Sequence, residues 1–460
     1  MIAALLLSLA GIGSQITDTQ TSLRFGRFGT VAVYHPAAPP TSVALFFSGD
    51  GGWNEGVVDM ARALADDGAL VLGVSTPHYL RQVDASLDRC AYFAGDVESL
   101  SQFAQKALGL PRYQPPILVG YSSGAGLVYA ALAQAPDNTF QGALSLGFDA
   151  LLPTKTSACV RNGLTSRAGP KGKGRLVAPV GHLPAPWIVL HGARDVVSPI
   201  DSVANFVKTV SGGELIPLPT VGHGFSKQDQ WLPQFRASVL RLAPKAPPPT
   251  AGGELPLGDL PVIELPPPPA PADYFAIVLS GDGGWASIDK AIGEELVKAG
   301  VPTVGFNSLQ YFWTKRSPEE SAADLERIIR HYQAALGREK LVIVGYSRGA
   351  DVLPLMVSRL PTALLAQIRL IAFIGLQPQT DLEFRIGDWL GPRQQATYRV
   401  LPEVEKLQGH PMLCIYGAKE DDSLCPNLPP GLADLAKLPG GHHFDGDYQG
   451  LATLILHHVR

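Results

Sequence analysis

The same six-residue turn, Ser-Gly-Asp-Gly-Gly-Trp, occurs twice in this chain, at residues 48–53 and at residues 280–285. Each copy directly follows an apolar run typical of a buried strand. Each is followed later by a Gly-x-Ser-x-Gly motif, at residues 120–124 and 345–349. The first serines of turn and motif are 74 positions apart in one copy and 67 in the other. Because both motifs recur together and in the same order, the chain is expected to contain two similar domains.

A proline-rich run at residues 244–273 separates the two copies. It is expected to be a semi-rigid linker, because proline is disfavoured in helix interiors and central strands. The remaining boundaries are a 1–20 N-terminal segment, an N-terminal domain at 21–243 and a C-terminal domain at 274–460. In both domains apolar strands alternate with helical stretches, which predicts a mostly parallel sheet with helices on both faces. The fold class is therefore α/β, and the two Gly-x-Ser-x-Gly turns, each between a strand and a helix, indicate tandem α/β-hydrolase-like domains.

The overall charge argues against one class of partner. The 460 residues carry a formal net charge of −4, and only 17% of them are charged. Such a chain has no basic field with which to hold a phosphate backbone, so nucleic-acid binding is not expected.

The first ten residues are apolar except for Ser8 and are followed by small and polar ones. This pattern, with a cut after Ala10, fits the end of a secretory signal peptide, although the basic start of such a signal is missing. A buried N-terminal strand or helix is the alternative. The apolar run is too short to span a bilayer, which needs about 20 residues. Export and cleavage is the preferred interpretation.

Four cysteines are divided equally between the two halves: Cys90, Cys159, Cys414 and Cys425. Their spacing matches no zinc-ligand pattern, so a zinc site is not expected. We also expect no other metal and no cofactor. In an oxidising compartment Cys414 can pair with Cys425 and Cys90 with Cys159. Free buried thiols are an equal alternative.

The two Gly-x-Ser-x-Gly turns present Ser122 and Ser347 as candidate nucleophiles. A serine hydroxyl needs a base to take its proton and a carboxylate to orient that base. In α/β-hydrolases these groups follow in the chain order serine, acid, histidine. The first half supplies Asp195 and His223 in that order, and the second half supplies His442 as the base.

Three residues compete for the acid of the second half. Counting back from the shared proline of the acid loop favours Asp422, whereas counting forward from the shared glycine favours Glu420. We rank Asp422 first, Glu420 second and Asp421 third.

The repeated Gly-Asp-Gly-Gly turn is expected to form an oxyanion hole together with the residue after each nucleophile. Backbone N–H groups that face the developing oxyanion contribute roughly 3 to 4 kcal/mol each to lowering the barrier. The candidate donors are Asp282, Gly283 and Arg348 in the second half and Asp50, Gly51 and Ser123 in the first.

Four segments of the second half together resemble the bacterial virulence protein family of VirJ and its two-domain relative AcvB: "SGDGGW", "GYSRGAD", "YGAKEDDSLCP" and "GGHHFDGDY". Residues 270–460 cover a whole VirJ-like domain, and the full chain resembles AcvB. The resemblance implies a periplasmic serine esterase that hydrolyses lysyl-phosphatidylglycerol and is linked to type IV secretion. It also implies Ser347 as nucleophile, His442 as base and an acid within residues 420–422.

A lysyl group carries two ammonium charges, so carboxylates near the pocket are expected to attract it. The site loops of the second half carry Asp282, Asp351, Asp445 and Asp447. Asp351 is the foremost candidate, because the first half has Gly126 at that position. Trp285 is a further candidate substrate contact.

The first half differs from the second around its motif serine. Its elbow "GYSSGAG" lacks the Arg-x-x-Asp, its histidine loop lacks the acidic tail, and a basic insertion occupies residues 166–175. We rank a docking or membrane-facing role first, with the basic insertion against anionic lipid, and a second hydrolase site next. For the whole chain, a non-catalytic periplasmic factor supporting type IV secretion and an esterase for another exported substrate remain as alternatives.

Overall fold

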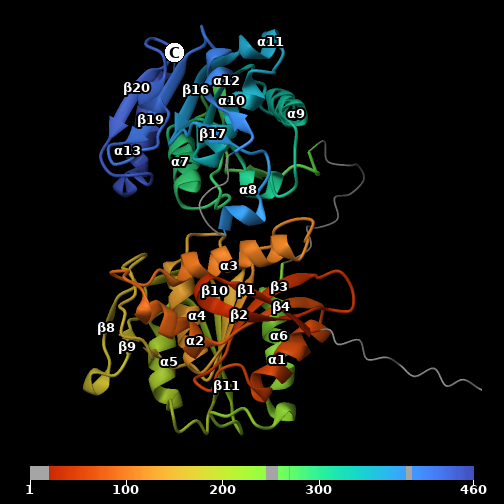
Figure 1. Ribbon diagram of the computed structural model, residues 1–460, viewed down its shortest axis with the longest axis vertical. Coiled ribbons are helices and arrows are strands. Elements are labelled where there is room, and N and C mark those ends of the chain that lie inside the picture. Colours follow the sequence, from red (N-terminus) through yellow and green to blue (C-terminus); the bar gives the residue numbers. More distant parts are fainter. Residues whose placement is uncertain (1–19, 245–256, 269, 390–395, 460) are drawn as a thin grey trace, which may run out of the picture.

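Figure 1 shows the computed structural model, which describes residues 20–244, 257–268, 270–389 and 396–459. The signal peptide expected within residues 1–20 falls outside these ranges except for its last residue. Across the described ranges, no helix combines the length and apolar character needed to cross a membrane.

The N-terminal domain is built on an eight-stranded sheet with the order β1-β2-β4-β3-β5-β6-β10-β11. All neighbours from β4 to β11 are parallel, and β1 and β2 form an antiparallel edge. The strands are β1 (Gln20–Phe25), β2 (Gly29–Tyr34), β3 (Ser42–Phe47), β4 (Ala69–Val74), β5 (Ile117–Tyr121), β6 (Gly142–Leu146), β10 (His182–Gly192) and β11 (Ser211–Leu218). The helices are α1 (Glu55–Asp66), α2 (Thr76–Ala85), α3 (Phe93–Ala107), α4 (Ser123–Gln134), α5 (Ile200–Lys208) and α6 (Leu232–Leu242).

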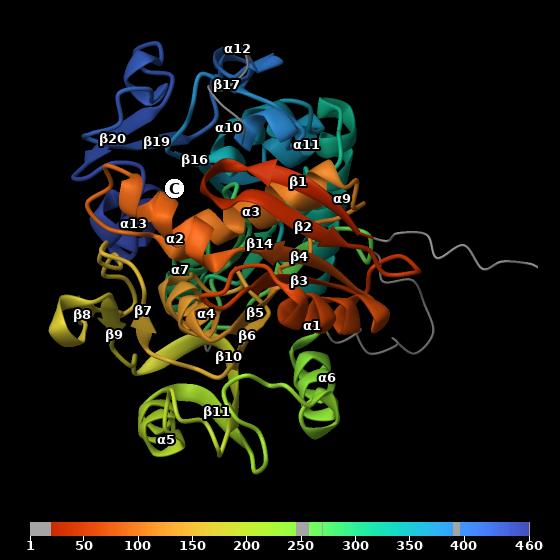
Figure 2. The same ribbon diagram turned by 60° about the horizontal axis from the view of Figure 1, so that its bottom comes forward.

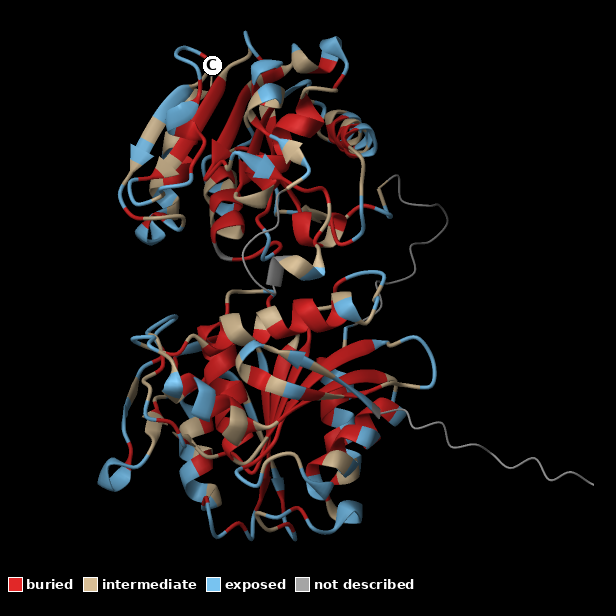
Figure 3. Cartoon of the chain, viewed as in Figure 1, coloured by how far each residue is buried: buried red, intermediate tan, exposed pale blue. Residues whose placement is uncertain are grey.

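Apolar cores lie on both faces of this sheet. Helices α1 and α6 pack on one face, and α2 to α5 pack on the other. Strands β3 and β4 are buried along their whole length, which explains why they read as continuous apolar runs rather than alternating ones. Figure 3 shows the buried strands enclosed by helices whose outer faces are exposed.

The C-terminal domain repeats this plan with a seven-stranded sheet in the order β12-β14-β13-β15-β16-β19-β20. Only the edge strand β12 is antiparallel to its neighbour. The strands are β12 (Val262–Glu264), β13 (Tyr274–Leu279), β14 (Thr303–Phe306), β15 (Lys340–Tyr346), β16 (Ile368–Ile374), β19 (Met412–Gly417) and β20 (Asp434–Leu438). The helices are α7 (Ser287–Lys298), α8 (Ser308–Tyr311), α9 (Pro318–Leu336), α10 (Arg348–Val357), α11 (Thr362–Leu365), α12 (Leu401–Glu405) and α13 (Tyr448–His458).

Small sheets decorate both domains. In the first, β7 (Leu151–Leu152), β8 (Ser166–Ala168) and β9 (Arg175–Val177) form a three-stranded sheet. The basic insertion lies on it, with exposed side chains at Arg167, Lys171 and Lys173. In the second, β17 (Gln379–Thr380) pairs with β18 (Tyr398–Arg399).

The predicted fold class is confirmed. Each domain has a mostly parallel sheet with helices on both faces, and the serine turn joins a central strand to a helix, β5 to α4 and β15 to α10. The chain therefore has the α/β-hydrolase fold in tandem.

The linker predicted at residues 244–273 is wrong in its second half. Val262–Glu264, a proline-free triplet inside the proline-rich run, adds β12 to the edge of the second sheet. Leu260 is buried in the second core, and Asn307 donates its backbone N–H to the carbonyl of Pro261 at 3.0 Å. Because these residues pair with the sheet, they belong to the C-terminal domain.

The two domains are in direct contact through α3 and the loop after it (Figures 1 and 2). Trp313 of the second domain donates to the carbonyl of Leu110 at 2.8 Å, and its ring lies 5.3 Å from that of Tyr113. Lys106 donates to the carbonyl of Trp313 and pairs with Glu383 at 3.1 Å. Tyr113 is buried within the core of the C-terminal domain, so this contact is a packed interface.

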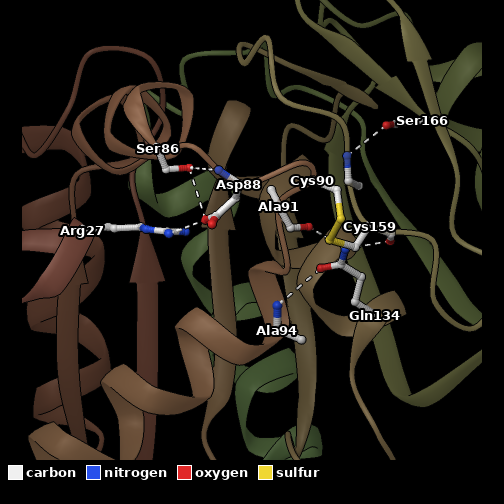
Figure 4. The surroundings of a disulfide bond; sticks show 10 residues. Arg27, Ser86, Asp88, Cys90, Ala91, Ala94, Gln134, Cys159 and Ser166 are labelled. Atoms are coloured by element: carbon white, nitrogen blue, oxygen red, sulfur yellow. Dashed lines mark hydrogen bonds and ion pairs between the residues drawn. A yellow bond between two sulfur atoms is a disulfide. The ribbon is translucent and has the colours of Figure 1, made fainter. Parts of the chain in front are cut away.

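Both cysteine pairs are bonded, Cys90 to Cys159 and Cys414 to Cys425. Figure 4 shows the first bridge beside Gln134, whose amide donates to the carbonyl of Cys159 at 3.0 Å. The second bridge joins β19 to the end of the loop that follows it.

Candidate active sites

Ser347 occupies a strained turn between β15 and α10. Its φ and ψ of 53° and −121° are angles that residues with a side chain rarely adopt. The flanking glycines make the turn possible: a Cβ on Gly345 would lie 2.5 Å from the carbonyl oxygen of Gly349. A Cβ on Gly349 would lie 2.4 Å from that of Leu279. This elbow places the hydroxyl beyond the carboxyl end of the strand, at the N-terminus of α10.

His442 lies between the serine and a carboxylate. Its Nε2 is 2.8 Å from Ser347 Oγ, and its Nδ1 contacts the carboxylate of Glu420. Burial lowers the pKa of His442, but the hydrogen bond to Glu420 and the surrounding carboxylates outweigh it. The pKa of His442 is therefore raised above its ordinary value. The predicted Ser347 and His442 are thus brought together.

The prediction of Asp422 as the triad acid is wrong. Glu420 contacts His442, and its other carboxylate oxygen accepts the backbone N–H of Gly417 at 2.5 Å. The Glu420 side chain is 4% exposed, whereas Asp421 and Asp422 are exposed. Counting back from the proline failed because the second acid loop is two residues longer than the first between its glycine and its proline.

The glycine turn lies against the nucleophile. Ser280 is fully buried, and its Oγ accepts the backbone N–H of Ser308 at 2.9 Å, which ties the turn to the next loop. A Cβ on Gly281 would be 3.4 Å from the Cβ of Ser347. The predicted oxyanion residues Asp282, Gly283 and Arg348 all line the cavity above the serine. Arg348 is the first residue of α10, where backbone N–H groups have no intrahelical acceptor.

The prediction that Trp285 contacts substrate is wrong. Its ring is 6% exposed and packs in the core against β14, where a Cβ on Gly305 would lie 2.7 Å from it. In the first domain Trp53 packs against Gly73 in the same manner. In both domains the tryptophan of the repeated turn therefore packs against the neighbouring strand and holds the turn on it.

The two other predicted substrate residues differ in their placement. Asp351 lines the cavity, and its carboxylate accepts the backbone N–H of Gln377 at 2.7 Å. Asp445 is not among the described residues that line the cavity and lies against the turn at Gly440, so its contact with substrate stays a prediction. Asp447 caps α13 by accepting the backbone N–H of Gly450.

The cavity above Ser347 has a volume of about 850 Å³ and is strongly acidic. Among the described residues that line it, two are cationic, Arg348 and Lys419. Seven are acidic: Glu98, Asp282, Asp351, Asp381, Glu420, Asp421 and Asp422. Arg348 is itself engaged, since it donates to the carbonyl of Asp381 and lies 4.5 Å from the ring of Phe384.

Glu98 is a site residue that the sequence did not reveal. It belongs to α3 of the N-terminal domain, and its Oε1 would be 3.9 Å from a Cβ on Gly283. Burial and the charge of Asp282 raise the pKa of Glu98 to about 8. No motif connects a helix of one domain to the active-site turn of the other, so only the docked domains show this contact.

The N-terminal domain holds a second arrangement of the same kind. Ser122 has a φ of 54° and a ψ of −118°, and its Oγ lies 3.0 Å from His223 Nε2. His223 Nδ1 lies 2.7 Å from Asp195, whose other oxygen accepts the backbone N–H groups of Val197 and Ser198. Burial alone would raise the pKa of Asp195, but these hydrogen bonds and the charge of His223 lower it. The three predicted residues of the possible second site are therefore in contact.

The glycine turn of this domain is also placed as in the other. Ser48 accepts the backbone N–H of Thr76 at 3.1 Å, and a Cβ on Gly49 would be 3.2 Å from that of Ser122. Asp50 and Gly51 line a cavity of about 600 Å³ above the serine. Ser123, the other predicted donor, is the first residue of α4.

The described residues of the two sites form no metal centre. Within the described part of the chain, no group of three or more His, Cys, Asp or Glu residues is placed to hold a metal ion.

A family model described as bacterial virulence protein (VirJ) matches residues 41–174 and 273–460, which is more than half of the chain. The chain belongs to this family. The match includes Ser122 of the first domain and the complete Ser347, His442 and Glu420 set of the second. No curated protein matches the sequence.

Solved structures of α/β serine hydrolases are similar to parts of the chain. The esterase domain of a Rhodothermus marinus protein is 16% identical and covers 48% of this chain and 96% of its own, with a TM-score of 0.33. A Coxiella burnetii α/β serine hydrolase homologue is 18% identical and covers 50% and 100%, also at 0.33. A lidless serine hydrolase of Xanthomonas campestris is 20% identical and covers 51% and 100%, at 0.34. The fold is assigned from the strand order and connections described above and not from these similarities.

Proposed function

We propose that the C-terminal domain is a serine hydrolase that cleaves the aminoacyl ester of lysyl-phosphatidylglycerol and releases lysine and phosphatidylglycerol. The observation that carries this proposal is the contact of Ser347, His442 and Glu420 beneath a cavity lined by seven Asp and Glu side chains. The triad supports the reaction class, and the acidic lining supports a cationic acyl group.

The reaction follows from the geometry. Ser347 Oγ attacks the ester carbonyl carbon while His442 Nε2 takes its proton, and Glu420 holds the Nδ1–H of the imidazole. The carbonyl oxygen becomes an oxyanion, which accepts the backbone N–H of Arg348 and one from the Asp282–Gly283 turn. His442 then protonates the leaving glycerol oxygen. Water, activated by the same imidazole, releases lysine from Ser347.

The charge of the cavity favours a lysyl group over a neutral acyl group. Carboxylates in a concave, partly desolvated site focus a negative potential and raise the local concentration of a cation. Asp421 and Asp422 lie directly beside Glu420 in the acid loop, whereas Asp282 lies in the glycine turn, next to Glu98 of the N-terminal domain. Carboxylates of the acid loop and of the glycine turn can therefore pair with the two ammonium groups of a lysyl ester.

The proposal includes export to the periplasm and action at the membrane surface. The two disulfides fit an oxidising compartment, where such bonds persist. The exposed cations of the basic insertion, Arg167, Lys171 and Lys173, would each contribute about 1 kcal/mol on an anionic leaflet.

The test uses the purified full chain and vesicles of phosphatidylglycerol that contain lysyl-phosphatidylglycerol, with free lysine as the measured product. We expect Ser347→Ala to lower lysine release by about 10⁴-fold or more, because the nucleophile is lost. Ser122→Ala is the matched control and is expected to release lysine at the wild-type rate.

Two results would contradict the proposal. If Ser347→Ala releases lysine as fast as the wild type, the domain is a non-catalytic factor on a hydrolase scaffold. If Ser122→Ala cleaves uncharged esters as well as or better than the lysyl lipid, the C-terminal site is an esterase for another substrate.

A further inference from the structure

The N-terminal domain contains every part that a serine hydrolase needs. Ser122, His223 and Asp195 are in contact at 3.0 and 2.7 Å, and Ser122 has the same strained backbone as Ser347. The glycine turn beside it and the start of α4 supply the same two positions for oxyanion donors. From the sequence alone we rank a docking or membrane-facing role first for this domain. Such a role does not require a strained serine aligned with a histidine and a buried carboxylate.

The site is separate from the one in the C-terminal domain. Its cavity lies above the carboxyl ends of the first sheet, and none of the described residues lines both cavities. The α3 helix that contributes Glu98 to the C-terminal cavity does not contribute to the lining described for this one.

The acid loops of the two sites differ in the two residues after the triad acid. Once Asp195 is matched to Glu420 by its contact with histidine, Val196 and Val197 stand where the C-terminal site has Asp421 and Asp422. Val196 is 88% exposed and Val197 61% exposed, so this loop presents apolar surface. Val197 also lines the cavity.

The rest of the lining agrees with that difference. Described residues of the N-terminal cavity include two acids, Asp50 and Asp59, and no lysine or arginine. The apolar and aromatic members are Val57, Met60, Tyr121, Val197, Phe225 and Trp231. A cavity with this lining binds an uncharged acyl group by removing its apolar surface from water.

We infer that the N-terminal domain is a second, independent ester hydrolase whose substrates carry an uncharged, apolar acyl group. Ser122 Oγ forms a bond to the acyl carbon as its proton passes to His223 Nε2, and the alcohol leaves with that proton. Water then adds to the acyl carbon, gives its proton to His223, and frees the carboxylic acid while Ser122 recovers its proton. The net reaction is ester plus water to alcohol plus acid.

The experiment uses the full chain with Ser347→Ala, so that only the N-terminal site can react and the outcome does not depend on the function of the other site. p-Nitrophenyl butyrate is the substrate and nitrophenolate the measured product. We expect Ser347→Ala to turn it over, and Ser122→Ala/Ser347→Ala to be at least about 100-fold slower. The exposed Ser202 of α5 supplies the control, because Ser202→Ala/Ser347→Ala should match Ser347→Ala.

A second measurement separates loss of the nucleophile from loss of the fold. A fluorophosphonate probe forms a bond to an activated serine and expels fluoride, and intact mass counts the adducts. We expect one adduct on Ser347→Ala and none on the double variant, with equal thermal unfolding midpoints. Turnover or labelling of Ser347→Ala no greater than that of the double variant would overturn the inference.

Discussion

The two sites of this chain share their reacting groups and differ at their rims. Ser122 and Ser347 have nearly the same backbone angles, and each contacts a histidine that contacts a carboxylate. Beside the acid, one loop continues with two valines and the other with two aspartates. The same turns therefore build the triad in both domains, and we propose that the two loop positions after the acid select the acyl group.

A second difference is that only the C-terminal site is completed by the other domain. Glu98 from α3 reaches the oxyanion turn at Gly283, whereas the N-terminal cavity is lined by its own domain alone among the residues described. We therefore propose two roles for the first domain: it is an enzyme, and its α3 helix forms part of the cavity of the C-terminal site.

The largest expected effect comes from the acid of the C-terminal site. Glu420→Gln should lower kcat for the lysyl ester by about 10⁴-fold, because the imidazole loses the partner that fixes its tautomer. Glu420 also raises the pKa of His442, so the acid limb of the kcat/KM profile should move to lower pH in the variant. Asp422→Asn is the control and should retain kcat within a few-fold. Equal losses in both variants would contradict the assignment of the acid.

Substitution of Trp53 and Trp285 tests whether the two repeated turns are held in the same way. Trp285→Ala should lower the free energy of unfolding of its domain by about 3–5 kcal/mol, because removal of the buried ring beside Gly305 leaves a cavity. Trp53→Ala should have a similar effect in the first domain, where the ring packs against Gly73. Calorimetry of both variants checks this. A change confined to KM, with normal stability, would instead make Trp285 a substrate contact.

Exchange of the acid-loop pairs tests the origin of the difference in specificity. Asp421→Val/Asp422→Val in a Ser122→Ala background should lower the ratio of kcat/KM for a cationic over a neutral ester by about 10 to 100-fold. An exposed carboxylate about 4 Å from an ammonium attracts it by about 1 kcal/mol, so the loss of two such carboxylates is of that order. Val196→Asp/Val197→Asp in a Ser347→Ala background should move the ratio in the opposite direction. An unchanged ratio in both would place specificity elsewhere in the cavities.

The smallest effect is expected from the contribution of α3. Since the pKa of Glu98 is raised to about 8, this carboxyl is neutral below that pH and negative above it. With a 6-aminohexanoyl ester, whose ammonium stays charged, kcat/KM of Ser122→Ala should rise by about 3 to 10-fold from pH 7 to pH 9 relative to a neutral ester. Glu98→Gln in the same background should abolish this rise. Persistence of the rise in that variant would exclude Glu98 as its source.

Much of this architecture could be predicted from the sequence because it is encoded locally. Ser317, Pro318 and Glu320 begin α9 with a capping box, and the glycines of each elbow mark the nucleophile. The order serine, acid, histidine then identified five of the six triad residues. Loop length decided the sixth, and counting from the proline chose the wrong carboxylate.

Features that depend on tertiary packing could not be predicted. Trp285 was expected to meet substrate because it lies in a site turn, but the glycine that makes room for its ring is on another strand. Val262–Glu264 reads as part of a proline-rich linker and becomes a strand only because β14 offers a free edge. Glu98 enters the C-terminal site only once the domains dock.

The most direct test of the account compares two esters of the same shape on the two single-site variants. 6-Aminohexanoyl and heptanoyl p-nitrophenyl esters differ by an ammonium in place of a terminal methyl group. We expect Ser122→Ala, which retains only the C-terminal site, to prefer the aminohexanoyl ester in kcat/KM, and Ser347→Ala to prefer the heptanoyl ester. The same preference in both variants, or no turnover by Ser347→Ala, would contradict it.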